Sequence, residues 1–126
     1  MAYRFEKERT VSTPYILIDE EKSYMRFEGR SFHENVAEFY REVNSWLDTY
    51  LVKDFGTFIF DFEMNYFNSS TSKLLHNMLT KMDKCVSDKK KVVVNWITTE
   101  DNDIIIECGE DFQEDFGNLK INMIIK

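Results

Sequence analysis

The sequence predicts an α/β fold in which one mixed β-sheet carries helices mainly on one face, within a single domain of residues 1–126. Apolar and polar residues alternate through residues 57–64 with the period of a strand, and apolar residues recur through residues 75–86 with the period of a helix. Strand and helix segments then alternate along the chain, which predicts parallel neighbouring strands joined by helical crossovers. Four glycines and one proline in 126 residues indicate short connections between these elements.

The first predicted elements form a hairpin. A polar lead-in ends at Pro14, and residues 15–19 and 24–28 have the composition of two strands. The polar connection between them has four residues, which is short enough for an antiparallel hairpin. The sheet is therefore expected to contain one antiparallel pair before its parallel part.

A helix is predicted to follow the hairpin, over residues 36–53. Its apolar residues recur three and four positions apart, which is the spacing of an amphipathic helix. Ser31 followed by Glu34 fits a capping box at its start, and Asn35 is the alternative cap. Trp46 on this helix is expected in the core, as is Trp96 farther along the chain.

Two further strands are predicted in the middle of the sheet. Strand 57–64 places Ile59, Asp61 and Glu63 opposite its phenylalanines, so the second face of the sheet is expected to be at least partly open. Residues 91–97 are rich in β-branched side chains without clean alternation. This run predicts a central strand that is buried on both faces.

The C-terminal part predicts one more helix and one more strand. Residues 100–108 are expected to be helical, although the apolar run within them also suits a strand. Gly109 is expected at the end of this helix, followed by an acidic turn or short helix up to Phe116. Residues 120–125 predict the last strand.

The most informative segment is Asn68–Lys73, which lies between strand 57–64 and the helix after it. Four consecutive hydroxyl residues, Ser69–Ser72, fall at the predicted helix N-terminus. Free backbone N–H groups and the positive end of the helix dipole favour a negative group there, such as a phosphate on a serine. Because Ser, Thr and Asn are also ordinary N-caps, capping alone is the alternative interpretation.

Composition excludes several classes of function. With 43% hydrophobic residues the chain can bury a core, and its net charge of −7 argues against a nucleic-acid partner. The sequence has no apolar run long enough to span a membrane and no signal-peptide pattern, so a cytoplasmic protein is expected. Cys85 and Cys108 lack the spacing of metal ligands and are expected to be reduced and structural.

No arrangement typical of an enzyme is found. His33 and His76 stand apart from any nucleophile pattern, and the sequence has no phosphate-binding loop, dinucleotide fingerprint or zinc motif. Carboxylates gather near the C-terminus and predict a solvated acidic face, the alternative being a small ligand- or metal-binding domain that uses this face. These carboxylates are Glu100, Asp101, Asp103, Glu107, Glu110, Asp111, Glu114 and Asp115. We expect neither catalysis nor a bound cofactor or metal.

Six patches in order along the chain resemble the SiaC family of bacterial regulatory phosphoproteins. The patches are Ser12–Pro14, Gly29–Asn35, Phe39–Tyr40 with Trp46–Leu47, Tyr66–Lys73, Val94–Trp96 and Gly109–Phe112. The resemblance covers nearly the whole chain. It implies a fold similar to that of STAS-domain anti-anti-sigma factors, and a regulator that acts by partner switching.

The resemblance also implies the regulatory chemistry. Such proteins are phosphorylated on a hydroxyl before a helix by a GHKL-type kinase, and a PP2C-like phosphatase reverses this. In the best-known system the unphosphorylated form binds a diguanylate cyclase and raises cyclic-di-GMP synthesis, which favours biofilm formation. The family's acceptor directly follows the Asn of a Tyr-x-Asn-Thr-Ser-Ser pattern, and this position is Ser69 here, with Ser70 and Thr71 as rivals.

The same resemblance implies a partner-binding set around the acceptor. Its members are Tyr66, Phe67, Asn68, Ser70, Thr71, Lys73, His33, Glu34 and Asn35. Lys73 is the candidate partner of a phosphate on Ser69, and one of Tyr66 and Phe67 is expected in the core because a strand end buries alternate residues. The chain departs from the family at His33, where Pro is common before Glu-Asn.

Overall fold

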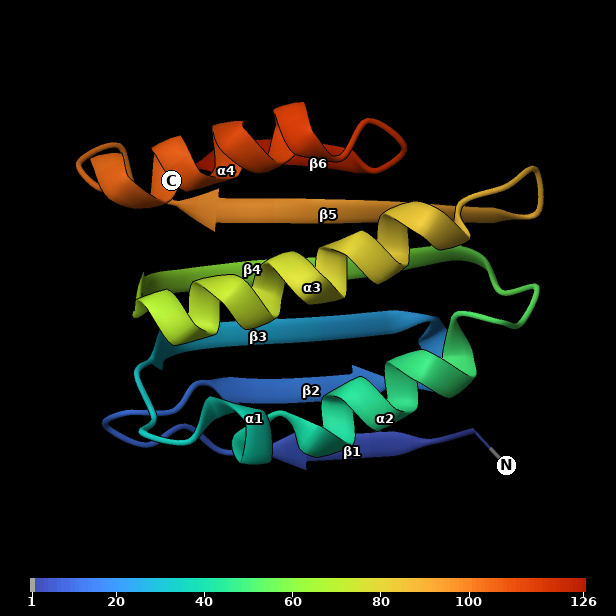
Figure 1. Ribbon diagram of the computed structural model, residues 1–126, viewed down its shortest axis with the longest axis horizontal. Coiled ribbons are helices and arrows are strands. Elements are labelled where there is room, and N and C mark those ends of the chain that lie inside the picture. The colour runs from blue at the N-terminus through green and yellow to red at the C-terminus, as the bar shows by residue number, and fades with distance from the viewer. Residues whose placement is uncertain (1) are drawn as a thin grey trace.

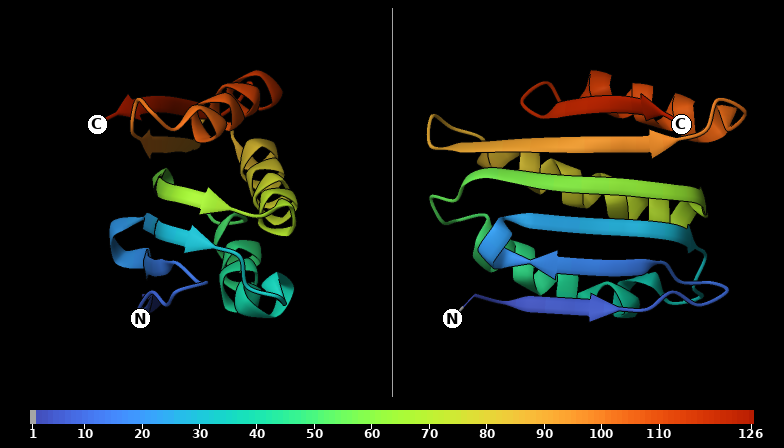
Figure 2. Two further views of the ribbon diagram at one scale, coloured as in Figure 1. Left: turned by 90° about the vertical axis from the view of Figure 1, so that its left-hand side faces the viewer. Right: turned by 180° about the vertical axis from the view of Figure 1, so that it is seen from behind.

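The α-helices cover one face of a six-stranded sheet and leave the other face without an α-helix, as the computed structural model of residues 2–126 shows (Figures 1 and 2). The α/β prediction with helices mainly on one face is confirmed. The strands are β1 (Arg4–Lys7), β2 (Tyr15–Asp19), β3 (Tyr24–Ser31), β4 (Gly56–Phe67), β5 (Lys90–Thr98) and β6 (Lys120–Ile125). The helices are the 3-10 turn η1 (Glu20–Lys22), α1 (Val36–Phe39), α2 (Arg41–Tyr50), α3 (Ser69–Cys85) and α4 (Asp103–Asp115).

The strands lie in the sheet in chain order, from β1 at one edge to β6 at the other. β2 and β3 form the predicted antiparallel hairpin, and β3 to β6 pair in parallel through helical crossovers. In the parallel part, the carboxyl ends of β3, β4 and β5 lie at the same end of the strands, which is called the carboxyl edge of the sheet below. No helix within residues 2–126 is long and apolar enough to span a membrane.

Strand β1 was not predicted. It pairs antiparallel with β2, from Arg4 opposite Asp19 to Lys7 opposite Ile16. Only Phe5 of its four residues is partly buried. An edge strand of this kind is held by main-chain hydrogen bonds and carries charged side chains, so it has no alternating apolar pattern to find.

The core lies between the sheet and the helices. Phe58, Phe60, Phe62 and Met64 of β4 all point into it and are at most 1% exposed. Trp96 stacks on Phe62 with ring centroids 4.3 Å apart. Trp46 on α2 is also buried, so the assignment of both tryptophans to the core is confirmed.

The predicted helix over residues 36–53 is in fact two helices, which meet at Tyr40. Asn35 caps the first of them, since its side chain accepts the Glu38 N–H at 3.2 Å. The capping box at Ser31 is wrong, because Ser31 ends β3 and is buried. Its hydroxyl contacts the Tyr40 hydroxyl at 2.8 Å and is therefore used inside the fold.

Helix α4 runs through Gly109, where the sequence predicted a helix end. A Cβ at this position would lie only 2.6 Å from atoms of Trp96 and Met123. Glycine therefore allows α4 to approach the sheet closely, and the Trp96 indole N–H donates to the Ile105 carbonyl at 2.8 Å. Close packing, and not helix termination, explains this glycine.

Strand β5 is central, as predicted. The prediction that it is buried on both faces is wrong. Val92, Val94 and Trp96 are buried, while Val93 and Asn95 on the other side are partly exposed. The β-branched residues of this run therefore serve strand formation on a half-open surface. The open second face that the sequence predicted is confirmed (Figure 2, right).

Candidate functional site

The hydroxyl segment lies where β4 ends and α3 begins, at the carboxyl edge of the parallel strands (Figure 1). Asn68 is the N-cap of α3, and its side chain accepts the Thr71 N–H at 2.9 Å. Ser69 is the first residue of the helix and Ser70 the second, and both are exposed. Two hydroxyls are thus available to solvent at a capped helix N-terminus.

Thr71, the third hydroxyl of the segment, is buried. It is 2% exposed, and its hydroxyl donates to the Ser31 carbonyl at 3.2 Å and lies 2.9 Å from the Ser31 hydroxyl. Its side chain therefore serves the interior of the fold. In this structure it reaches neither a kinase nor a partner surface.

A β-bulge at Asn65 turns an aromatic ring outward beside this segment. Gly29 pairs with Met64, but the next pair joins Arg30 to Tyr66, so Asn65 is the extra residue of β4. Tyr66 is 46% exposed as a result. Phe67 turns inward, with ring centroids 5.8 Å from Phe62 and 6.4 Å from Trp96.

Tyr66 belongs to a small exposed cluster at the end of β3 and β4. Its ring meets that of Phe32 edge to face, with centroids 5.8 Å apart. The Arg30 guanidinium lies 5.2 Å from the Phe32 centroid and 5.5 Å from the Tyr66 centroid, within the range of cation–π attraction. The cluster presents two rings and one positive charge.

A mainly apolar pocket of about 260 Å³ lies beside Ser69. It is formed by the end of β4 and the starts of α3 and α4, and Asn102 holds this arrangement by donating to the Asn65 carbonyl at 3.0 Å. Ile104, on its α4 side, is 79% exposed. The lining residues are Asn65, Tyr66, Phe67, Asn68, Ser69, Ser72, Asn102, Ile104, Ile105 and Cys108.

Lys73 is exposed and lies four residues after Ser69 on α3. Residues four apart on a helix are neighbours on its surface. Lys73 takes part in none of the ion pairs found within residues 2–126. Its ammonium group is therefore free to meet a negative group at the start of α3.

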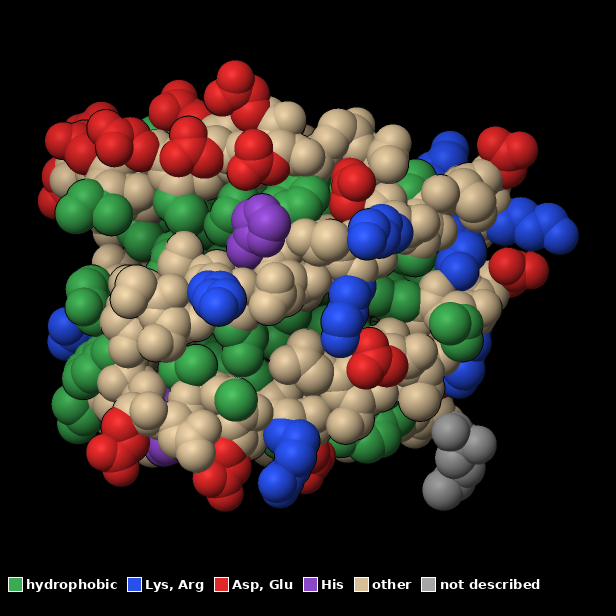
Figure 3. Space-filling view, viewed as in Figure 1, with side chains coloured by type: hydrophobic (Ala, Val, Ile, Leu, Met, Phe, Trp, Pro, Cys, Tyr) green, Lys and Arg blue, Asp and Glu red, His purple; other side chains and the backbone are tan. Residues whose placement is uncertain are grey.

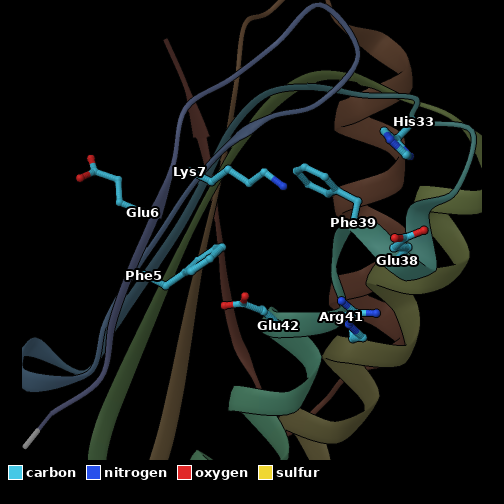
Figure 4. A pocket seen from close by; sticks show the side chains of 8 residues that line it. All are labelled: Phe5, Glu6, Lys7, His33, Glu38, Phe39, Arg41 and Glu42. Carbon is cyan, nitrogen blue, oxygen red and sulfur yellow. The ribbon is translucent and has the colours of Figure 1, made fainter.

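His33, Glu34 and Asn35 lie outside the pocket beside Ser69. His33 stacks on Phe39 with centroids 5.9 Å apart, and its Nδ1 accepts the Asn35 N–H at 2.9 Å. It lines a separate cavity of about 520 Å³ between β1 and the start of α2, together with the charged side chains of Lys7 and Arg41 (Figure 4). The predicted partner-binding residues are thus divided between two places.

The acidic, histidine and thiol side chains of the described residues 2–126 form no metal-binding group. These residues contain no group of three His, Cys, Asp or Glu side chains that could hold a metal. The carboxylates of α4 are exposed and spread along the outer side of the helix (Figure 3). Burial raises the pKa of both thiols, that of Cys108 to about 11, so neither is activated as a thiolate.

The sequence model of the SiaC family of regulatory phosphoproteins matches residues 7–126. The chain belongs to this family. A solved structure of apo-SiaC from Pseudomonas aeruginosa is 24% identical, with a TM-score of 0.85 over 96% of this chain and 99% of that one. SiaC in the crystal structure of the diguanylate cyclase SiaD in complex with its activator SiaC, also from Pseudomonas aeruginosa, is 23% identical. Its TM-score is 0.89 over 97% of this chain and 99% of that chain.

One sequence relative also matches most of the chain. An uncharacterized protein of Pseudomonas aeruginosa strain UCBPP-PA14 is 26% identical over 106 residues, which are 84% of either chain. The solved structures match the six-stranded mixed sheet and its helices described above. The assignment to the SiaC family thus rests on a match along nearly the whole chain.

Sequence reasoning missed four residues of the site in this SiaC-family chain. They are Arg30, Phe32, Asn102 and Ile104. Arg30 and Phe32 lie within a patch that resembles the family, yet only the bulge at Asn65 brings them to Tyr66. Asn102 and Ile104 are distant in sequence and reach the site because α4 begins at the same edge of the sheet. No local sequence pattern predicts that these residues reach the site.

Proposed function

We propose that this chain is a non-enzymatic regulator whose binding to a diguanylate cyclase is switched by reversible phosphorylation of Ser69. The position of Ser69 carries the proposal. It is exposed, it opens a capped helix of 17 residues, and it lines the rim of the mainly apolar pocket. A single hydroxyl thus combines access for a kinase with control over a binding surface.

The electrostatics support a switch at this position without a change of fold. Phosphorylation adds about −1.5 to −2 charges at neutral pH. At a helix N-terminus the dipole favours such a charge by about 0.3–1 kcal/mol, so the local structure tolerates it. On the rim of an apolar pocket the same dianion must be desolvated before a partner can bind. The partner therefore distinguishes the two forms directly.

Family membership supports the choice of partners. The relative SiaC forms a complex with the diguanylate cyclase SiaD as its activator, and we extend this role to the present chain. A GHKL-type kinase would supply the phosphate from ATP in the cytoplasm, and a PP2C-like phosphatase would remove it. Tyr66, Phe67, Asn68, Ser70 and Lys73 would surround the phosphorylated group. Thr71 is no longer proposed as an acceptor or as a contact, since it is buried.

The His33–Asn35 segment is proposed as a second contact region. It lies at the start of α1, beside its own charged cavity. His33, Glu34 and Asn35 would therefore contact a part of the partner that does not enter the pocket beside Ser69. The cyclase or the kinase would then contact this protein at two separate regions.

Phosphorylation by a purified GHKL-type partner kinase with ATP tests the acceptor. Intact-mass and fragment-ion mass spectrometry should find one phosphate, on Ser69. Ser69→Ala should abolish it, and the matched control Ser70→Ala should not. If Ser69→Ala carried as much phosphate as wild type, the acceptor would be Ser70. No phosphate on wild type, with the kinase active on a control substrate, would leave only helix capping and favour the ligand-binding alternative.

Calorimetry with a purified diguanylate cyclase tests the switch. The unphosphorylated chain should bind, and the phosphorylated chain should bind about a hundredfold more weakly, which is about 2.7 kcal/mol. Treatment with the PP2C-like phosphatase should restore binding. Equal affinity of the two forms would contradict the proposed switch, even if Ser69 is the acceptor.

A further inference from the structure

Three buried hydroxyls connect the start of α3 with the end of β3 and the junction of α1 with α2. Tyr40, Ser31 and Thr71 are at most 2% exposed. The Ser31 hydroxyl lies 2.8 Å from the Tyr40 hydroxyl and 2.9 Å from the Thr71 hydroxyl. Ser31 lies in β3, Thr71 in α3 and Tyr40 between α1 and α2, and the three meet beneath the exposed turn that carries Ser69 and Ser70.

The hydrogen bonds of this triad have one consistent direction. Thr71 donates its hydroxyl to the Ser31 carbonyl at 3.2 Å. Ser31 must then donate to Thr71, and Tyr40 to Ser31, because each hydroxyl has one proton to give. In this triad of Tyr40, Ser31 and Thr71, every hydroxyl proton is donated. The last hydrogen bond of the series runs from the Thr71 hydroxyl to a backbone carbonyl.

The Ser31 carbonyl holds the first turn of α3 by two bonds. Besides the Thr71 hydroxyl, it accepts the Asn68 N–H at 3.1 Å. Asn68 in turn accepts the Thr71 N–H through its side chain at 2.9 Å. The N-cap and the third residue of the helix are therefore fixed to the end of β3, and the rotation of the first turn about the helix axis is set.

That rotation decides which serine faces the pocket. Successive residues of a helix are about 100° apart, so with Thr71 inward Ser69 and Ser72 lie on one side and Ser70 on the other. The pocket lining agrees with this geometry, since it contains Ser69 and Ser72 but not Ser70. A turn that rotated by one residue would bring Ser70 to the position that Ser69 occupies beside the pocket.

We propose that Thr71 is a positioning residue, whose buried hydroxyl makes Ser69 and not Ser70 the phosphate acceptor. This inference rests on the proposed phosphorylation of the Ser69 turn. It explains why the three adjacent hydroxyls are not equally good phosphate acceptors. The Thr71 hydroxyl is buried and hydrogen-bonded in the triad, and it orients Ser69 and Ser70. Its test is the choice of serine, a property that a loss of stability alone does not change.

The first experiment compares the full chain and three variants in the kinase reaction, with fragment-ion mass spectrometry of the product. Thr71→Val keeps the side-chain shape without the hydroxyl, and should lower the ratio of Ser69 to Ser70 phosphate by about tenfold, the effect of one buried hydrogen bond. Thr71→Ser should restore the wild-type ratio. Val92→Ala, in the core near the start of β5, should leave the ratio unchanged although it destabilises the fold.

An unchanged ratio in Thr71→Val would overturn the inference, whereas phosphorylation of neither serine in wild type would overturn the proposed function instead. Backbone hydrogen exchange tests the positioning without any kinase. The Asn68 and Thr71 amides should exchange about tenfold faster in Thr71→Val than in Thr71→Ser, because one bond to the Ser31 carbonyl is lost. Equal exchange in the two variants would overturn the positioning role directly.

Discussion

The open face of the sheet and the edge that carries Ser69 are both polar, but they use their polar groups differently. On the open face, Arg26 contacts three carboxylates, those of Glu63 at 2.6 Å, Glu28 at 3.0 Å and Asp61 at 3.5 Å. Asp61 also accepts from the Tyr24 hydroxyl at 2.6 Å. The charges of this face are satisfied by one another.

The Ser69 edge shows the opposite pattern. Within residues 2–126 the side chains of Ser69 and Lys73 have no hydrogen-bonding or ion-pair partner in the fold, and Tyr66 and Ile104 are exposed beside an apolar pocket. Charges that are already paired within the fold leave little for a partner to gain, because a partner would have to replace contacts that exist. Unused polar groups around exposed apolar side chains are what a binding surface requires. The contrast predicts which substitutions change stability and which change binding.

Arg26→Met should give the largest effect, on stability alone. It keeps the apolar stem and removes the cation that three partly buried carboxylates share. Glu28 keeps Arg9 and Glu63 keeps Lys126, while Asp61 loses its cation, so the free energy of unfolding should fall by about 2–3 kcal/mol. Chemical denaturation measures this. Arg4→Met, which removes an exposed ion pair, should cost less than about 0.5 kcal/mol. If Arg26→Met weakened cyclase binding instead, the open face would be a binding surface and the contrast would fail.

Tyr66→Ala should give the next largest effect, on binding. Aromatic anchors at the centre of an interface contribute about 2 kcal/mol, so the affinity for the cyclase should fall roughly thirtyfold. The unfolding free energy should change little, because almost half of the ring is already exposed. Val52→Ala, which removes exposed apolar area after the end of α2, is the control in the calorimetric titration. Equal losses for the two variants would show that exposure alone, and not the pocket, decides binding.

A pH series should show a smaller effect on the open face. Burial would raise the pKa of Glu28, but its bond to Arg26 and the charges of Arg26 and Arg9 lower it below its usual value. A lowered pKa stabilises the fold above the unfolded value of about 4.3, and this contribution is lost as the pH falls through the folded value. The stability gap between wild type and Arg26→Met should therefore narrow from pH 7 to pH 3. A constant gap would mean that Arg26 acts through packing.

Much of this fold could be predicted because its signals are local. Strand 57–64 and helix 75–86 show their periods within one window of sequence, and the hairpin follows from the length of its connection. The elements that were missed depend on distant partners. β1 exists only through pairing with β2, and at the break between α1 and α2 the Tyr40 hydroxyl bonds to Ser31 in another element.

The site divides in the same way. The position of Ser69 at a helix start follows from the sequence, because capping residues stand directly between two periodic patterns. The exposure of Tyr66 does not follow, since one bulge residue reverses the alternation of the strand. Burial of Thr71 is equally hidden, because its partner Ser31 lies 40 residues away. The sequence therefore predicts which turn carries the site, whereas tertiary contacts determine which of its residues are exposed.

Lys73→Ala should give the smallest effect, and only in the phosphorylated chain. A phosphate on Ser69 and an ammonium group one turn later form an exposed pair, which contributes about 0.3–0.5 kcal/mol at low salt. Denaturation of phosphorylated and unphosphorylated wild type and Lys73→Ala completes a double-mutant cycle. Lys84→Ala, an exposed lysine near the other end of α3, should show no dependence on phosphorylation. A coupling near zero at low salt would mean that Lys73 leaves the phosphate to its partner, so that the Ser69 edge keeps both charges available for binding.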